Sequence, residues 1–259
     1  MDLERMRLAA RRAADVGAQV IREAPMPGIA AAKGLPGDWV TEVDLASERA
    51  IAGSLAEATP EIPFSGEELG GAETAGPHWV VDPLDGTTNF VHGFWAGGVS
   101  VALVDEGPLV GAIAAPFLGD RWHAAAGAGA VWERADGSSS PCRVSERAAD
   151  AAVVATGFPF RHKERLPRYV VAMTAALDRF EDLRRPGAAC LDLAWTACGV
   201  FDGFFELGLA PWDVAAGALL VLEAGGRVTD WDGGVGYLSG DILAGPPQVH
   251  EQLARIARG

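Results

Sequence analysis

The chain has 259 residues, a mass of 27.0 kDa and a formal net charge of −14 at neutral pH. A chain of this length can bury a large core without disulfides or structural metals, as one domain or as two closely packed halves. Because nucleic-acid phosphates are bound by patches of Lys and Arg, the acidic balance and the lack of a basic run predict no nucleic-acid partner.

The first sixty residues predict two helices. Apolar residues recur at helical spacing over residues 2–24, and two prolines end the pattern. A stretch rich in glycine and small residues follows at 28–38 and contains Lys33, for which a catalytic-loop role and a plain surface position are both open. The second helix is expected from Thr41 to about Thr59.

The rest of the chain predicts strands first, and then strands alternating with helices. From Trp79 to Val144, short runs of β-branched and small residues separated by Gly, Pro and Asp indicate consecutive antiparallel strands, and 137–140 indicates a surface hairpin loop. Beyond about residue 150, strands are expected at 152–156, 203–207 and 241–245, and helices at 167–179, 188–198, 214–224 and 249–257. This alternation predicts a layered α/β arrangement.

The termini and cysteines bear on the cellular environment. The N-terminal residues mix charges and have no long apolar core behind them, so we expect no secretory signal or membrane anchor, and a cytoplasmic location. Cys142, Cys190 and Cys198 are odd in number and lack Cys-x-x-Cys spacing, which supports neither a disulfide framework nor a zinc site. We interpret them as buried free thiols.

Residues 79–90, WVVDPLDGTTNF, carry the strongest functional signal. An apolar strand runs into Asp82 and Asp85, whose carboxylates are the oxygen ligands that Mg²⁺ prefers. Pro83 fixes its own φ and has no N–H, which predicts a tight bend that turns both carboxylates toward one ion cluster. A glycine and two threonines follow at an expected helix start, where free N–H groups and the helix dipole favour an anion such as phosphate.

At these residues the chain resembles the inositol monophosphatase family of Mg²⁺-dependent, lithium-sensitive phosphatases, which is related to fructose-1,6-bisphosphatases and nucleotide-bisphosphate phosphatases. Three further segments match in the family's order: FSGEE at 64–68, GAACLDL at 187–193 and PWDVAAG at 211–217. The resemblance spans nearly the whole chain. It implies a single domain over 1–259 with the layered αβαβα sandwich of the inositol monophosphatase and fructose-1,6-bisphosphatase type, and a homodimer. It also implies an α+β half at about 1–147, an α/β half at about 148–259, and an active site between them.

The resemblance further implies the ligands of two or three Mg²⁺ ions per active site. Glu67, Asp82 and the backbone carbonyl of Leu84 would hold the first ion, and Asp82, Asp85 and Asp213 the second. Two such ions lower the pKa of the attacking water and stabilise the leaving oxygen of a phosphate monoester. Glu68, next to Glu67, is interpreted as an outer-sphere or structural residue.

The catalytic roles also come from the resemblance. The attacking water would lie between Glu67 and Thr87, whose hydroxyl passes its proton toward Asp44. In the expected phosphate-binding segment Gly86, Thr87 and Thr88, the N–H groups of the first two bind phosphate oxygens and Thr88 helps to hold the acidic loop. Without the matched segments, Asp44 would be an ordinary helix cap, and Asp213 is also expected to cap its helix.

The substrate side is expected to combine carboxylates and backbone groups. By the resemblance, Glu206 would accept a hydrogen bond from a sugar or inositol hydroxyl. Gly187, Ala188 and Ala189 would present N–H groups to ring hydroxyls at a helix N-terminus, and Asp85 and Asp213 would also touch the substrate. Histidinol-phosphate phosphatases of the same superfamily tend to have Gly-Asp where this chain has Gly-Ala. This difference weakens the alternative that the chain hydrolyses histidinol phosphate.

Several functions stay open at this stage. The leading one is Mg²⁺-dependent hydrolysis of inositol monophosphate and related polyol or sugar phosphates. The segment GFPF at 157–160 resembles bacterial and archaeal members, some of which also hydrolyse fructose 1,6-bisphosphate, and the basic residues at 161–165 are either a solvated loop or a second phosphate site. A 3′-phosphoadenosine 5′-phosphate phosphatase is a weaker alternative, and a regulatory partner-binding module with vestigial catalysis is the non-enzymatic one. The lack of paired His residues at metal-ligand spacing disfavours a zinc or iron hydrolase.

Overall fold

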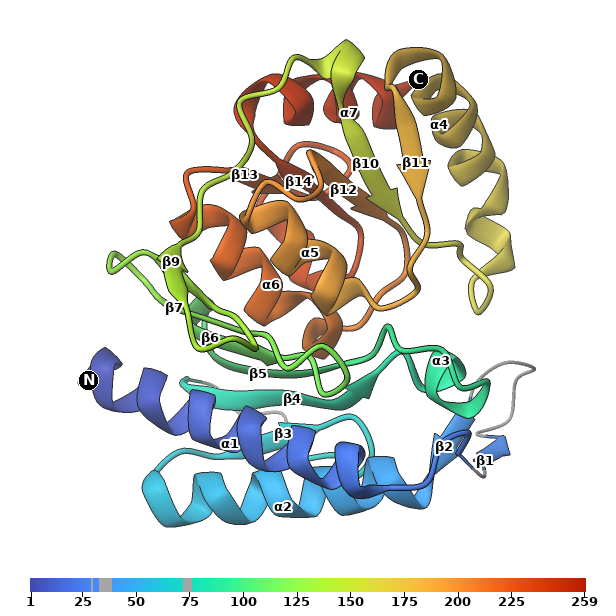
Figure 1. Ribbon diagram of the computed structural model, residues 1–259. Helices are drawn as coiled ribbons and strands as arrows, with labels where there is room; N and C mark the ends of the chain where they lie inside the picture. Colours follow the sequence, from blue (N-terminus) through green and yellow to red (C-terminus); the bar gives the residue numbers. More distant parts are fainter. Residues whose placement is uncertain (29, 33–38, 72–75) are drawn as a thin grey trace.

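The computed structural model describes residues 1–28, 30–32, 39–71 and 76–259, and it has five layers (Figure 1). One outer layer is formed by helices α1 (Leu3–Glu23) and α2 (Glu42–Ala58). A seven-stranded sheet, a central pair of helices and a five-stranded sheet follow, and two further helices close the opposite side. The expected layered αβαβα sandwich is therefore confirmed. Lys33 lies outside the described residues.

The seven-stranded sheet follows the chain order from β3 to β9. Neighbouring strands are antiparallel except for the parallel pair β3 and β4. The strands are β3 (Phe64–Gly66), β4 (His78–Asp85), β5 (Gly98–Asp105), β6 (Gly107–Ala114), β7 (Arg121–Ala125), β8 (Ala130–Glu133) and β9 (Ser139–Pro141). A two-stranded ribbon of β1 (Ala30–Ala32) and β2 (Trp39–Thr41) precedes α2, and the short helix α3 (Thr87–Val91) follows β4.

The five-stranded sheet has the order β11-β10-β12-β14-β13. Strand β10 runs parallel to both of its neighbours, whereas β14 runs antiparallel to both of its own. The elements of this half are β10 (Val153–Thr156), α4 (Leu166–Arg179), β11 (Asp182–Arg184), α5 (Ala189–Ala197), β12 (Gly203–Glu206), α6 (Pro211–Glu223), β13 (Arg227–Thr229), β14 (Ile242–Gly245) and α7 (Pro247–Arg258). Short 3₁₀ turns lie at Ala149–Ala151, Lys163–Arg165 and Gly236–Ser239.

Most predicted elements occur within a few residues of their expected bounds. The loop expected at 137–140 is partly wrong, because Ser139–Pro141 pairs with β8 as strand β9. Strands β11 and β13 were not anticipated, since each has only three residues and no clear alternation. Helix α6 starts before the expected position because Pro211 occupies its first turn, where the missing N–H has no intrahelical partner to lose.

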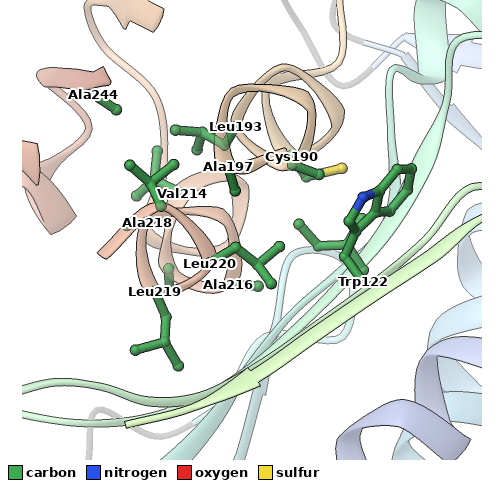
Figure 2. Close-up of a cluster of buried hydrophobic side chains, with 14 of the residues drawn as sticks. Trp122, Cys190, Leu193, Ala197, Val214, Ala216, Ala218, Leu219, Leu220 and Ala244 are labelled. Atoms are coloured by element: carbon green, nitrogen blue, oxygen red, sulfur yellow. The ribbon is translucent and has the colours of Figure 1, made fainter. Parts of the chain in front are cut away.

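The central helices α5 and α6 lie between the two sheets, so all of α5 and the stretch 214–221 of α6 are buried (Figure 1). Such a helix is apolar all round. The two helices and the adjoining sheets share one hydrophobic core. Figure 2 shows Cys190 and Leu193 of α5, Val214 and Leu220 of α6 and Trp122 of β7 within this core. Gly217 allows the two helices to approach closely, because a Cβ there would lie 2.4 Å from the Leu193 Cβ. Both helices begin at the edge of this hydrophobic core, where the candidate site lies.

No helix within the described ranges is long and apolar enough to cross a membrane.

Candidate active site and metal centre

Three carboxylates from distant parts of the chain converge beside the end of β4. Asp82, Asp85 and Asp213 each place an oxygen within 4.8 Å of the oxygens of the other two. The pairing of β4 with β5 shifts register between Asp82 and Asp85, as expected for a strand bent at Pro83. The N–H of Leu84 donates to Asp82 Oδ1 at 2.9 Å and holds that carboxylate in the bend.

The third carboxylate comes from the first turn of α6. Asp213 Oδ2 accepts the N–H of Ala210 at 2.7 Å, so one oxygen holds the start of the helix. The helix start is anchored to the other half of the molecule, because Ser100 Oγ on β5 donates to the Trp212 carbonyl at 2.8 Å. The predicted cap at Asp213 therefore exists. Asp213 is the third residue of α6, and its carboxylate accepts the backbone N–H of Ala210, the residue just before the helix.

The electrostatics of this cluster favour a divalent cation. Burial and the nearby carboxylates of Glu67, Asp85 and Asp213 raise the pKa of Asp82 well above its usual value. Burial and Asp213 raise the pKa of Asp85 to about 7, and burial outweighs local hydrogen bonds to raise that of Asp213 to about 6. These groups are hard oxygen donors whose negative charges repel one another until a cation neutralises them, so they fit Mg²⁺.

Thr87 lies between the carboxylate cluster and Asp44. Its Oγ is 2.9 Å from Asp44 Oδ1 and 3.0 Å from the Leu84 carbonyl oxygen, and its single hydroxyl hydrogen can serve either acceptor. The other Asp44 oxygen accepts the N–H of Thr41 at 2.9 Å and also its hydroxyl. Burial raises the pKa of Asp44, although the hydrogen bonds from Thr41 and Thr87 act against it. Asp44 therefore caps α2 and contacts Thr87 at the same time.

One face of α2 holds three segments of the site. Asp44, Ser47 and Glu48 are fully buried, each with 0% exposure. Ser47 Oγ donates to the Pro83 carbonyl at 2.9 Å. Glu48 accepts the N–H groups of Glu68 at 2.9 Å and Leu69 at 3.0 Å. The helix thus contacts the Thr87 segment, the bend of β4 and the loop that carries Glu67.

Sequence reasoning missed Ser47 and Glu48. Their spacing from Asp44, three and four residues along a predicted helix, places all three side chains on one face, and this was the available signal. Gly66 explains how Glu48 comes so close to the Glu67 loop. A Cβ at Gly66 would lie 1.7 Å from Glu48 Oε1, so only glycine fits.

The predicted phosphate segment begins at a glycine that no other residue could replace without strain. Gly86 has φ +89°, and a Cβ there would lie 2.8 Å from the Ala96 carbonyl oxygen. Thr87 and Thr88 form the first turn of α3. Asn89 on the same helix donates to the carbonyls of Ala96 at 2.7 Å and Pro186 at 2.9 Å, which ties α3 to the loop before α5.

The predicted substrate residues Gly187, Ala188 and Ala189 lie at the start of α5, which contacts the cluster at Asp85. Ala188 is the capping residue of α5, Ala189 is its first residue, and the N–H of Cys190 donates to Asp85 Oδ2 at 2.6 Å. Gly187 precedes them with φ +90°, and its carbonyl lies beside Gly86. The N-terminus of α5 therefore meets both the acidic bend and the phosphate segment.

Glu206, at the end of β12, is partly buried and close to the cluster. Burial and the neighbouring charge of Asp213 raise its pKa to about 8, whereas Arg185 and Arg161 act in the opposite direction. Gly157 leaves space for its carboxylate, because a Cβ at Gly157 would lie 2.0 Å from Glu206 Oε1. The glycine of the GFPF segment is thus explained by close contact with Glu206.

Arg185 is a further residue that the sequence did not single out. Its guanidinium carbon lies 5.5 Å from the ring centroid of Phe158 and 5.6 Å from that of Phe160, and both rings are exposed. Nothing in the local sequence predicts this contact, because it forms between distant segments. In the basic loop after these rings, His162 pairs with Glu164 and Arg165 pairs with Asp241.

Comparison with known proteins gives this arrangement a family. The sequence model of the inositol monophosphatase family matches residues 2–259. The chain belongs to this family. An inositol monophosphatase from Anabaena has a TM-score of 0.87 and 32% identity, and the match covers 100% of this chain and 97% of that one. The suhB protein of Bartonella henselae has a TM-score of 0.84 and 35% identity, and the match covers 98% of this chain and 97% of the other. The family resemblance inferred from the sequence is confirmed.

Curated relatives within the family bear a different kind of name. A putative Nus factor SuhB from Neisseria meningitidis is 43% identical over 224 residues, which cover 85% of this chain and 84% of the relative. The Nus factor SuhB of Escherichia coli K12 is 38% identical over 251 residues, with 94% and 92% coverage. The expectation that the chain has no nucleic-acid partner therefore receives no support from its relatives.

The affinity for Mg²⁺ is expected to rise between about pH 6 and pH 8. The pKa values of Asp85 and Asp213 are raised to about 7 and about 6, so below those values protons compete with the cation for the same oxygens. Each proton released on binding makes the apparent dissociation constant fall by about tenfold per pH unit. Calorimetric Mg²⁺ titrations at pH 6, 7 and 8, in buffers of different ionisation enthalpy, measure both quantities. Equal affinity at the three pH values, with no proton release, would contradict this prediction.

The raised pKa values of Asp85 and Asp213 also change the stability of the protein without Mg²⁺. Between the usual carboxyl pKa and the raised value, the folded protein binds more protons than the unfolded chain. The free energy of unfolding without Mg²⁺ should therefore fall as pH rises through this window, and the stabilisation produced by Mg²⁺ should grow.

Proposed function

We propose that the chain is a Mg²⁺-dependent phosphomonoesterase that acts on inositol monophosphate and related polyol or sugar phosphates. The observation that carries this proposal is the convergence of Asp82, Asp85 and Asp213 beside the Thr87–Asp44 pair. Buried carboxylates that repel one another destabilise a fold, so they are understandable where a cation is bound and used. The proposed ligands are Glu67, Asp82, the Leu84 carbonyl, Asp85 and Asp213.

When bound, Mg²⁺ supplies Lewis acidity toward the phosphate and the leaving oxygen. The protein's own groups place the reactants. Thr87 donates its hydroxyl hydrogen to Asp44, so its oxygen lone pairs are left to accept a hydrogen bond from the attacking water. Asp44, whose pKa is raised by burial, can receive the proton that Thr87 passes on. Water would then form the new bond to phosphorus and give one proton through Thr87 to Asp44, while the ester P–O bond breaks and the leaving alkoxide takes up a proton from solvent.

The phosphate and the alcohol are held by different parts of the site. The N–H groups of Gly86 and Thr87 are proposed to bind the phosphate oxygens, and Thr88 to support that segment. Glu206 and the backbone of Gly187, Ala188 and Ala189 are proposed to bind the hydroxyls of the polyol. Backbone N–H donors beside a cluster of carboxylate acceptors can hydrogen-bond to a ligand that is rich in hydroxyls.

The decisive experiment is phosphate release from a panel of esters with Mg²⁺, with EDTA and with added Li⁺. The panel contains myo-inositol 1-phosphate, fructose 1,6-bisphosphate, histidinol phosphate and 3′-phosphoadenosine 5′-phosphate. Release that requires Mg²⁺, is inhibited by Li⁺ and is highest with inositol phosphate would support the proposal. Release led by another ester would identify an alternative substrate, and no release from any ester would overturn the proposal.

The alternative function is partner binding with vestigial catalysis. The name Nus factor SuhB, which several relatives carry, is the observation that favours it. Binding alone does not require the buried, mutually repelling carboxylates of the cluster, and for this reason we place catalysis first. The homodimer implied by the resemblance and a cytoplasmic location stay predictions.

Replacement of Glu206 by Gln is expected to reduce discrimination among esters. At pH 9, above the raised pKa of Glu206 of about 8, the variant loses the charged acceptor for a ring hydroxyl, so KM for inositol monophosphate should rise by about fivefold to tenfold. Turnover of p-nitrophenyl phosphate, which has no ring hydroxyls, should change by less than about threefold if the rest of the site is intact. Steady-state kinetics with both substrates measure the difference.

Glu223→Gln is the matched control, because Glu223 accepts the N–H groups of Gly127 and Gly129 at the far end of α6. Unchanged discrimination would remove Glu206 from the substrate site.

A further inference from the structure

Two cysteines that are far apart in the sequence lie in direct contact. Cys142 Sγ and Cys198 Sγ are 3.0 Å apart, about 1 Å longer than a disulfide bond of about 2.05 Å. Cys142 follows strand β9, and its N–H donates to the Ala130 carbonyl on β8 at 2.8 Å. Cys198 is the capping residue at the C-terminal end of α5. The contact therefore joins the seven-stranded sheet to a central helix.

The two sulfurs differ in access. Cys142 is 5% exposed, whereas Cys198 is only partly buried, which corrects the interpretation of all three thiols as buried. Cys198 lines an open surface groove together with Arg143 and Arg147. The hydrogen bond with Cys198 and burial both raise the pKa of Cys142, so Cys142 stays a thiol until its partner has reacted. An oxidant can thus reach Cys198 first, with Cys142 directly behind it.

We propose that Cys142 and Cys198 form a reversible disulfide when the protein meets a disulfide oxidant such as oxidised glutathione. Cys198 loses its proton and attacks one glutathione sulfur, which gives a mixed disulfide and releases one glutathione thiol. Cys142 then loses its proton and attacks the Cys198 sulfur, and the second glutathione leaves as a thiol. The two protein sulfurs are oxidised together, and the oxidant is reduced to two thiols.

The bond would restrain the two halves of the molecule relative to each other. The closed loop runs from residue 142 to residue 198 and includes β10, α4, β11 and α5. A link across a loop of this length removes much conformational freedom from the unfolded chain. Cys190 is not part of this device, because it is fully buried beside Asp85 at the opposite end of α5.

The test is to incubate the full chain with oxidised glutathione under native conditions and to map its peptides by mass spectrometry. We expect a link between the peptides that contain Cys142 and Cys198, a loss of two hydrogens from the intact mass, and reversal by dithiothreitol. The melting temperature should rise by about 5 °C or more on oxidation. Cys142→Ala and Cys198→Ala should both abolish the link and the rise, whereas Cys190→Ala should still form the link.

Three results would overturn the proposal. Cys198 could carry glutathione without exchange to Cys142, or it could link two copies of the chain through Cys198 alone. Both thiols could also stay unmodified at glutathione concentrations that oxidise an exposed model dithiol. Because the mapping uses the wild-type chain, the conclusion does not depend on how well the variants fold.

Discussion

Replacement of Asp213 by Asn is expected to reduce Mg²⁺-dependent phosphate release by roughly 10²-fold to 10³-fold, because the site loses one of the three carboxylates that face a common point. The substitution keeps the shape of the side chain. The Asn oxygen can still accept the N–H of Ala210, so the start of α6 is preserved. The loss of activity would therefore report on charge and ligation. Initial rates at saturating Mg²⁺ and substrate measure it.

The same variant should be more stable than the wild type when Mg²⁺ is absent. At pH 8 Asp213 is ionised in both the folded and the unfolded chain, and its raised pKa of about 6 means that the charge is unfavourable in the fold. An amide removes this cost. Once the partial exposure of the side chain is taken into account, a gain of about 1 kcal/mol is expected, or about 2–4 °C in melting temperature for a chain of this size.

Asp230→Asn is the matched control for both measurements. Asp230 is also partly buried and accepts backbone N–H groups, from Gly234 at 2.7 Å and Asp232 at 3.0 Å, but it lies in a turn after β13. Its pKa is lowered by these hydrogen bonds despite some burial, so the Asn variant should lose stability and keep its turnover. Full turnover in Asp213→Asn would refute the proposed ligand role of Asp213, whatever its stability.

The acidic bend could be predicted because its information is local. Asp82, Pro83 and Asp85 follow one another at the end of an apolar run, so residue types and spacing alone point to two carboxylates facing one cation. The arrival of Asp213 beside them depends on how α6 packs between two sheets. Only the resemblance placed it there before the structure was known.

The residues that sequence reasoning missed are those whose roles depend on contacts between distant segments. Glu48 looks like an ordinary charged residue of an amphipathic helix, yet it is fully buried against the loop that carries Glu67. Arg185 meets Phe158 and Phe160 only because β11 lies beside β10. The spacing of Cys142 and Cys198 in the sequence does not indicate that they meet. Their contact forms only when the two halves of the molecule pack together. The layers of the fold follow from periodicity, whereas these pairings require the register of the sheets.

Replacement of Glu48 by Gln is expected to raise the Mg²⁺ concentration needed for half-maximal activity by about tenfold to a hundredfold. Two backbone N–H groups, from Glu68 and Leu69, point at the Glu48 carboxylate. Gln has only one oxygen to offer them, and its amide group would oppose the second N–H. The loop that carries Glu67 would lose one of its attachments to α2. Because saturating Mg²⁺ can draw the loop back into place, the maximal rate should change by less than about threefold.

The ratio of these two effects separates a positioning role from a purely structural one. Glu57→Gln is the control on the same helix, because Glu57 is exposed and lies 3.7 Å from Arg12 in a surface ion pair, which contributes little to stability. It should leave both the Mg²⁺ requirement and the maximal rate unchanged. A Glu48 variant that melts at a lower temperature but keeps the wild-type Mg²⁺ requirement would show that the buried carboxylate supports only the fold.

Burial raises the pKa of Glu48 to about 7, so protonation in the wild type should have a similar but smaller effect below that pH. If so, the Mg²⁺ requirement of Glu48→Gln should vary less with pH than that of the wild type.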